Sequence, residues 1–165
     1  MKPQDIVVLL KIFSEEKGLW TQVSLANALF ISQSEISESI SRSKYAKLLF
    51  ADGKRVAKKP LLDLIVYGVP YFYPQQPGQV LRGVATSHSA FPLNEHIMSN
   101  EHYVWPYAKG KMRGHSIQPL YPSVVQAVQR DAKLYELLTL VDAMRVGKTR
   151  ERNLAAELLS NWLHD

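Results

Sequence analysis

The first part of the chain carries apolar residues at helical spacing. Pro3 suits the first turn of a helix, and Gly18 suits its end. Between them the apolar positions recur every three or four residues: Ile6, Val7, Leu9, Leu10 and Phe13. This pattern predicts a first helix from Pro3 to about Gly18.

Two shorter helices are predicted next, each after a residue that suits an N-cap. Thr21 precedes a stretch that ends near Leu29, and Ser32 precedes one that runs to about Lys47. Glu35, three residues after Ser32, fits a capping box. Only residues 30–32 separate the two helices, so we expect them to cross, as in a helix-turn-helix.

A hairpin is predicted after the third helix. Leu48–Ala51 is followed by Asp52-Gly53, a dipeptide favoured in tight turns, and then by the basic run Lys54–Lys59. Pro60 then opens another helical stretch, from Leu61 to Val69. The hairpin would therefore present a basic outer face.

The rest of the chain changes in character twice. Residues 70–122 mix tyrosine and tryptophan with seven prolines, which predicts an ordered but irregular segment with short strands, one of them near Val80–Thr86. Apolar spacing then predicts a long helix over residues 123–146, ended by Gly147, and a last helix over residues 149–164. We expect two parts, residues 1–69 and 70–165.

Composition and charge narrow the class of protein. The 165 residues are 46% hydrophobic, enough for a core, and the absence of cysteine excludes disulfides and thiolate chemistry. No apolar run approaches a membrane span and no signal-peptide plan is present, so a cytoplasmic protein without membrane association is expected. The net charge is +5, and residues 1–60 hold ten Lys and Arg against six Asp and Glu. A positive surface concentrated there favours a polyanionic partner such as nucleic acid.

The region from Pro3 to Lys59 resembles the winged helix-turn-helix regulators of bacteria, a broad type that includes the multiple-antibiotic-resistance (MarR) regulators. The resemblance rests on residues 25–40, where a Leu-Ala pair is followed by a turn and by a serine-containing helix with Ile36 and Ile40 on one face. It covers the N-terminal third of the chain. The expected fold is mainly α with a small β wing: a winged helix-turn-helix, an irregular aromatic segment and a C-terminal helical hairpin.

The third helix and the hairpin supply the candidate DNA-binding residues. A recognition helix presents polar side chains to a major groove about 12 Å wide, and a basic wing neutralises phosphates beside it. Gln33 and Ser37 share a face and are the expected base readers, whereas Arg42 is expected to hold a phosphate. Glu35 and Glu38 would oppose DNA. The expected DNA-binding residues are Gln33, Ser34, Ser37, Ser41, Arg42, Lys44, Lys54, Arg55, Lys58 and Lys59.

The sequence contains no convincing pattern for catalysis, a cofactor or a metal. Gly147-Lys148-Thr149 is similar to the end of a phosphate-binding loop, but Asp142 stands where that motif needs a glycine. The five histidines lack paired ligand spacing on a helix, and Ser87-His88-Ser89 lacks a nucleophile-elbow motif. We expect no enzymatic activity, no cofactor and no metal site.

The sequence therefore predicts a bacterial DNA-binding transcriptional regulator. It would read a two-fold-related operator on double-stranded DNA as a homodimer, with the apolar helices at residues 123–146 and 149–164 as the dimer or partner interface. The alternative is a protein-interaction module, such as an antitoxin-like adaptor, in which the winged fold is a scaffold that does not touch DNA. Glu35 and Glu38 favour that alternative. The two interpretations differ in whether the hairpin and the serine face of the third helix lie on one side of the domain.

Overall fold

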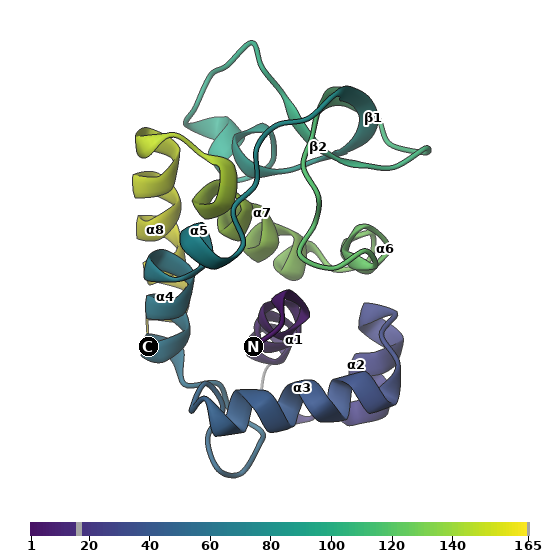
Figure 1. Cartoon of the computed structure of the whole chain (residues 1–165), viewed down its shortest axis with the longest axis vertical. Coiled ribbons are helices and arrows are strands. Elements are labelled where there is room, and N and C mark those ends of the chain that lie inside the picture. The colour runs from purple at the N-terminus through teal and green to yellow at the C-terminus, as the bar shows by residue number, and fades with distance from the viewer. Residues whose placement is uncertain (16–17, 165) are drawn as a thin grey trace.

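The computed structural model is mainly helical with one small sheet, and it describes residues 1–15 and 18–164. Its α-helices are α1 (Pro3–Ser14), α2 (Gln22–Leu29), α3 (Gln33–Tyr45), α4 (Lys58–Tyr67), α5 (Val69–Phe72), α6 (Val124–Val128), α7 (Ala132–Val146) and α8 (Thr149–Leu163). The strands are β1 (Val80–Ala85), β2 (Tyr103–Pro106) and β3 (Met112–Ser116), and two short 3-10 turns, η2 (Ser87–Ser89) and η3 (Leu93–Glu95), lie between β1 and β2. Figure 1 shows α2 and α3 at one end of the molecule and the sheet at the other.

Helices α2 and α3 begin where the capping residues predict, but Glu35 does not complete the predicted capping box, and its side chain accepts from Tyr121 Oη instead. The Ser24 amide donates to Thr21 Oγ1 (3.0 Å), and the Glu35 amide donates to Ser32 Oγ (3.3 Å). Phe30 ends α2 in the left-handed region, with φ of 55°. The three-residue connection between α2 and α3 is thus confirmed, while α3 ends at Tyr45, two residues earlier than predicted.

The hairpin is shorter than predicted. It is closed by a single antiparallel bridge between Leu49 and Val56, and helix α4 already begins at Lys58. The assignment of Lys58 and Lys59 to the hairpin was therefore wrong. Pro60 falls within the first turn of α4, where its missing N–H needs no helical partner, so the helix starts ahead of the proline.

The long helix predicted over residues 123–146 is interrupted. It divides into α6 and α7, because the Asp131 carboxylate accepts the Leu134 amide (3.0 Å) and caps a new helix. Gly147 ends α7 as predicted, and α8 then packs along α7. The C-terminal helical hairpin is confirmed as α7 and α8.

The small sheet is formed by the segment that was expected to be irregular. Strand β1 pairs antiparallel with both β2 and β3, and β2 pairs in parallel with β3, so the three strands close on one another. The predicted strand near Val80–Thr86 is confirmed as β1. A buried carboxylate joins this sheet to α7: Trp105 Nε1 and Thr86 Oγ1 each donate to Asp142 Oδ2 (2.6 Å), and Arg145 pairs with Asp142 Oδ1 (2.8 Å).

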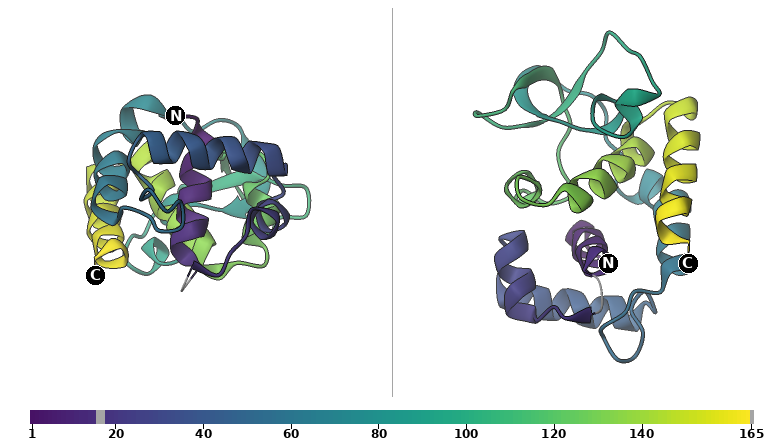
Figure 2. Two further views of the ribbon diagram at one scale, coloured as in Figure 1. Left: turned by 90° about the horizontal axis from the view of Figure 1, so that it is seen from below. Right: turned by 180° about the vertical axis from the view of Figure 1, so that it is seen from behind.

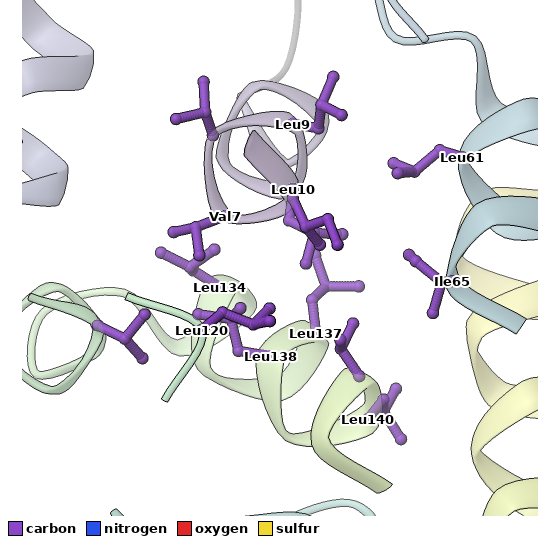
Figure 3. Close-up of a cluster of buried hydrophobic side chains, with 14 of the residues drawn as sticks. Val7, Leu9, Leu10, Leu61, Ile65, Leu120, Leu134, Leu137, Leu138 and Leu140 are labelled. Carbon is purple, nitrogen blue, oxygen red and sulfur yellow. The ribbon is translucent and has the colours of Figure 1, made fainter. Parts of the chain in front are cut away.

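Helix α1 lies at the centre of the molecule (Figure 1 and Figure 2). Figure 3 shows Val7 and Leu10 on the side of α1 that faces α7, and it shows Leu61 and Ile65 of α4 directed toward α1. The core runs through both expected parts of the chain, residues 1–69 and 70–165. Its fully buried members include side chains that were expected to form a dimer interface: Leu134, Leu137, Leu138, Val141 and Leu159. In the described ranges no helix is both long and apolar enough to cross a bilayer.

One buried ion pair connects α1 to α3. The Asp5 carboxylate is fully buried and receives Arg42 Nε (2.9 Å) and Arg42 Nη2 (2.8 Å). Burial acts to raise the pKa of Asp5, but hydrogen bonds from Arg42 and from the Lys2 amide outweigh it and hold that pKa below its usual value. The charged carboxylate is therefore favoured in the folded protein more than in the unfolded chain.

Replacing Asp5 by Asn should destabilise the protein in a pH-dependent way. Loss of the charged bonds to Arg42 is expected to lower the free energy of unfolding by about 1.5–3 kcal/mol at neutral pH. Because the folded pKa is depressed, the stabilisation is fully present above the usual aspartate pKa of about 3.9 and is lost as pH falls below it. Urea unfolding at several pH values measures the difference, which should shrink in acid. A difference independent of pH would contradict this role of Asp5.

Candidate nucleic-acid interface

Helix α3 presents one continuous polar face. Successive residues of an α-helix are offset by about 100°, so Gln33, Ser37 and Lys44 fall within a narrow arc of roughly 40°. The apolar side chains Ile36 and Ile40 point into the core instead. The residues predicted for this face are all exposed: Gln33, Ser34, Ser37, Ser41 and Lys44. No other segment of the described chain covers this face of the helix.

Arg42 lies on the opposite side of the helix. Nine residues separate it from Gln33, which corresponds to about 180° around α3. Its guanidinium is occupied by the bidentate pair with Asp5. The residue expected to hold a phosphate is thus placed against α1, outside the polar face.

The two glutamates of α3 are also displaced from the centre of this face. Tyr121 Oη donates to Glu35 Oε2 (3.1 Å), which directs Glu35 toward the segment that precedes α6. Glu38 is 66% exposed, with its Oε2 atom 3.9 Å from Arg42 Nη1. One acidic side chain therefore remains accessible at the border of the polar face, and the other is held by the protein.

The hairpin turn touches the C-terminal part of α3. A Cβ atom at Gly53 would lie 3.5 Å from Lys44 Cδ, so the Lys44 side chain extends along the turn. Trp20 packs against the turn: Lys54 Nζ lies 4.3 Å from the centre of the Trp20 ring and donates to the Trp20 carbonyl (3.2 Å). In Figure 1 the hairpin loop projects from the end of the molecule occupied by α3. The basic turn and the polar face of α3 therefore adjoin each other.

Asp52 shapes the turn and balances part of its charge. Its Oδ1 accepts the amides of Lys54 (2.8 Å) and Arg55 (3.3 Å), and its Oδ2 pairs with Arg55 Nε (3.0 Å). The Lys54 amide and the Arg55 side chain lower the pKa of Asp52, so the carboxylate stays charged. Arg55 also lies over the half-exposed Phe50 ring, 5.0 Å from its centre. The turn is a rigid group of charges with a small positive excess.

The remaining two predicted cations belong to a different element. Lys58 and Lys59 lie in the first turn of α4, and Lys59 pairs with Asp63 one turn further along. Lys58 and Lys59 nevertheless line the same hollow as Lys54 and Arg55. The structure thus places Lys44 beside the turn and the four wing cations around one hollow, and it places Arg42 against α1.

Two exposed residues at the end of α3 were missed. Tyr45 is 93% exposed, and Lys47 is exposed with φ of 61°, in the left-handed turn that leads into the hairpin. Both lie between the two elements of the candidate surface. Their position shortly after Lys44, the last residue of the third helix that was assigned to DNA binding, is the sequence signal that could have identified them.

The described chain offers no cluster for a metal ion, since no three His, Asp or Glu side chains within residues 1–15 and 18–164 are grouped to hold one. His88 illustrates the pattern: its Nε2 atom contacts the Glu101 carbonyl (2.7 Å), and its ring packs edge-on against Tyr103. These are contacts of a histidine within a packed interior. The described side chains of the α3 surface can supply hydrogen bonds and positive charge.

Comparison with known proteins adds no relative. No protein-family model matches the sequence, and no curated protein or solved structure is significantly similar to it.

Proposed function

We propose that this chain is a cytoplasmic winged helix-turn-helix regulator of transcription that binds double-stranded DNA through α3 and the hairpin. The observation that carries the proposal is that Lys44, on the exposed face of α3, lies beside Gly53 at the hairpin turn, where an added Cβ atom would lie 3.5 Å from Lys44 Cδ. This placement puts the polar face of the helix and the basic turn on one side of the protein. A winged helix needs this arrangement to enter a groove and hold the flanking phosphates.

The residues of this surface divide into two roles. Gln33 and Ser37 lie near the N-terminal end of α3, the part of a recognition helix that contacts base edges, and their short side chains suit hydrogen bonds in the major groove. Lys44, Lys54 and Arg55 lie at the other end, where they hold phosphates and fix the register of the helix. Specificity would thus come from the start of α3 and affinity from its end.

The position of the glutamates supports DNA binding over the interaction-module alternative. That alternative gains weight if acidic side chains dominate the side shared by α3 and the hairpin. Glu35 is instead directed to Tyr121, and Asp52 is paired with Arg55. Glu38 alone among the acidic residues of α3 is left largely exposed.

A homodimer remains part of the proposal, because a single short recognition helix reads few base pairs and a two-fold pair reads twice as many. Its interface cannot use the apolar residues of α7 that fill the core. Large exposed aromatics remain in the consecutive helices α4 and α5: Tyr67 is 72% exposed, Tyr71 79% and Phe72 73%. We assign the dimer contact to this group, since exposed apolar patches mark interaction sites.

Replacing Gln33 by Ala should change which DNA sequence is preferred. The loss of a base contact is expected to cost about 1–3 kcal/mol at one position of a site selected from random duplexes, with little effect on a scrambled duplex. Asn161→Ala, an exposed amide on α8, is the matched control. If Gln33→Ala and Ser37→Ala both leave the two affinities unchanged, α3 does not enter the groove, and the interaction-module alternative replaces the regulator.

Replacing Lys44 and Arg55 by Gln should weaken binding to all duplexes alike. Each phosphate contact contributes about −0.9 to the slope of log affinity against log salt, so the double variant should flatten that slope by about 2. Fluorescence anisotropy across a salt series gives the slope, and Arg130→Gln with Arg150→Gln gives the same change of net charge on other exposed positions. An equal effect in the control would mean that only the total charge matters.

Replacing Tyr67 and Tyr71 by Ser should produce a monomer. Both side chains are exposed in the single chain, so the change removes interface area without opening a core cavity. Analytical ultracentrifugation at micromolar concentration measures the mass of the wild type and the variant. A wild-type chain that sediments as a monomer, or a variant that remains dimeric, would refute this interface.

A further inference from the structure

A second cationic surface lies on the small sheet. Arg82 on β1 and Arg113 on β3 stand directly opposite each other in the antiparallel pair, and both are exposed. Lys109 and Lys111, also exposed, lie in the loop that leads from β2 into β3. We call these four residues the sheet surface. Figure 1 and the right panel of Figure 2 show the sheet at the end of the molecule away from α3.

The backbone around these four cations is tightly fixed. A Cβ atom at Gly110 would lie 2.1 Å from the Gly83 carbonyl oxygen, so only glycine allows the loop to approach β1 this closely. The Tyr107 amide donates to the Arg82 carbonyl (3.0 Å), and Arg82 Nη1 donates to the Gly110 carbonyl (3.3 Å). The loop that carries Lys109 and Lys111 is therefore held beside Arg82.

The charges of the sheet surface are not neutralised by the protein. Some cations elsewhere in the chain are paired with acids, as in Arg42 with Asp5, Lys11 with Asp131 and Arg55 with Asp52. Within the described ranges, no Asp or Glu forms an ion pair with any of the four sheet-surface residues.

Like charges placed directly opposite on neighbouring strands destabilise a sheet. Arg82 and Arg113 are in this position, with Cβ atoms about 4.5–5.5 Å apart by the geometry of such pairs. An anion bound between the two guanidinium groups would remove that repulsion. The repulsion between Arg82 and Arg113 thus lowers the stability of the free protein, and anion binding would restore that stability.

We propose that the sheet surface binds the phosphodiester backbone of a nucleic acid, independently of sequence and separately from α3. Guanidinium groups match phosphate oxygens with two parallel hydrogen bonds, and Arg82 and Arg113 provide two such groups side by side. A nucleic acid strand offers phosphates at a regular repeat, which suits several cations fixed on a rigid support. Together with the proposed role of α3, the sheet surface would let one protomer hold two separate segments of nucleic acid.

The test separates the two surfaces by substitution. The helix variant carries Gln33→Ala, Ser37→Ala and Lys44→Gln, and the sheet variant carries Arg82→Gln and Arg113→Gln. Binding of a labelled random-sequence duplex is measured by anisotropy between about 50 and 200 mM salt. The helix variant should keep salt-dependent binding without sequence preference. Adding the sheet substitutions to it should lower that residual affinity at least tenfold and flatten the log–log slope by about 2, at about 0.9 per phosphate contact.

Controls make each outcome decisive. Arg130→Gln with Arg150→Gln, added to the helix variant, matches the change in charge, and an equal loss there would overturn the proposal. So would a helix variant that binds no duplex. If the sheet variant loses its circular dichroism signal, Lys109→Gln with Lys111→Gln replaces it, because these side chains lie on an exposed loop. Sheet-dependent binding to phosphatidylserine vesicles without binding to duplex would assign the surface to a membrane instead. If the α3 proposal is wrong, the helix variant will keep the sequence preference of the wild type, and this result is distinct from the outcomes above.

Discussion

Helix α1 is apolar around most of its circumference, so it can fold only if other elements enclose it. Eight of its twelve residues are buried, a pattern typical of a central helix, whereas a surface helix shows a single apolar stripe. Helices α2 and α3 pack against it from one direction and α7 from the other. The N-terminal helices and the C-terminal hairpin therefore depend on the same helix for their burial.

This shared enclosure also sets the orientation of the candidate DNA-binding face. The buried Asp5 carboxylate needs a partner, and Arg42 provides it, which fixes the rotation of α3 about its own axis. With Arg42 turned inward, Gln33 and Ser37 must face outward. Two further hydrogen bonds hold the start of α3 and the end of α2: Tyr121 donates to Glu35, and Ser123 Oγ donates to the Leu29 carbonyl (2.6 Å). The segment before α6 thus helps to hold α2 and α3 in position.

The two cationic surfaces differ in whether other side chains of the protein contact their cations. At the hairpin, Asp52 pairs with Arg55, and Trp20 holds Lys54, so the turn is ordered before any ligand binds. On the sheet, Arg82 and Arg113 are fixed by the backbone but lack acidic partners in the described chain. Preorganised cations of the first kind favour a defined docking geometry, while unneutralised cations of the second kind favour binding of any polyanion.

Local sequence determined several helix boundaries at which a capping residue or glycine acts within one turn, although α1 ends at Ser14 and not at Gly18 as predicted. Thr21, Ser32 and Gly147 are such positions, because their effect depends on neighbours only a few residues away. The exposed residues on the polar face of α3 followed from the helical period in the same way. Asp131 also acts locally, but its capping role became evident only with the break between α6 and α7.

Only the tertiary structure decided which partners distant residues would find. From the sequence alone Arg42 was expected at the surface, but in the structure it pairs with Asp5, 37 residues away in the sequence. The leucines of α7 were expected to form an interface, but they are buried and α1 covers them. The pairing of Arg82 with Arg113 depends on the register of strands 31 residues apart. The spacing of apolar residues indicates the period of a single helix or strand. Long-range contacts depend instead on how several elements pack together to bury apolar surface, which is a property of the whole fold.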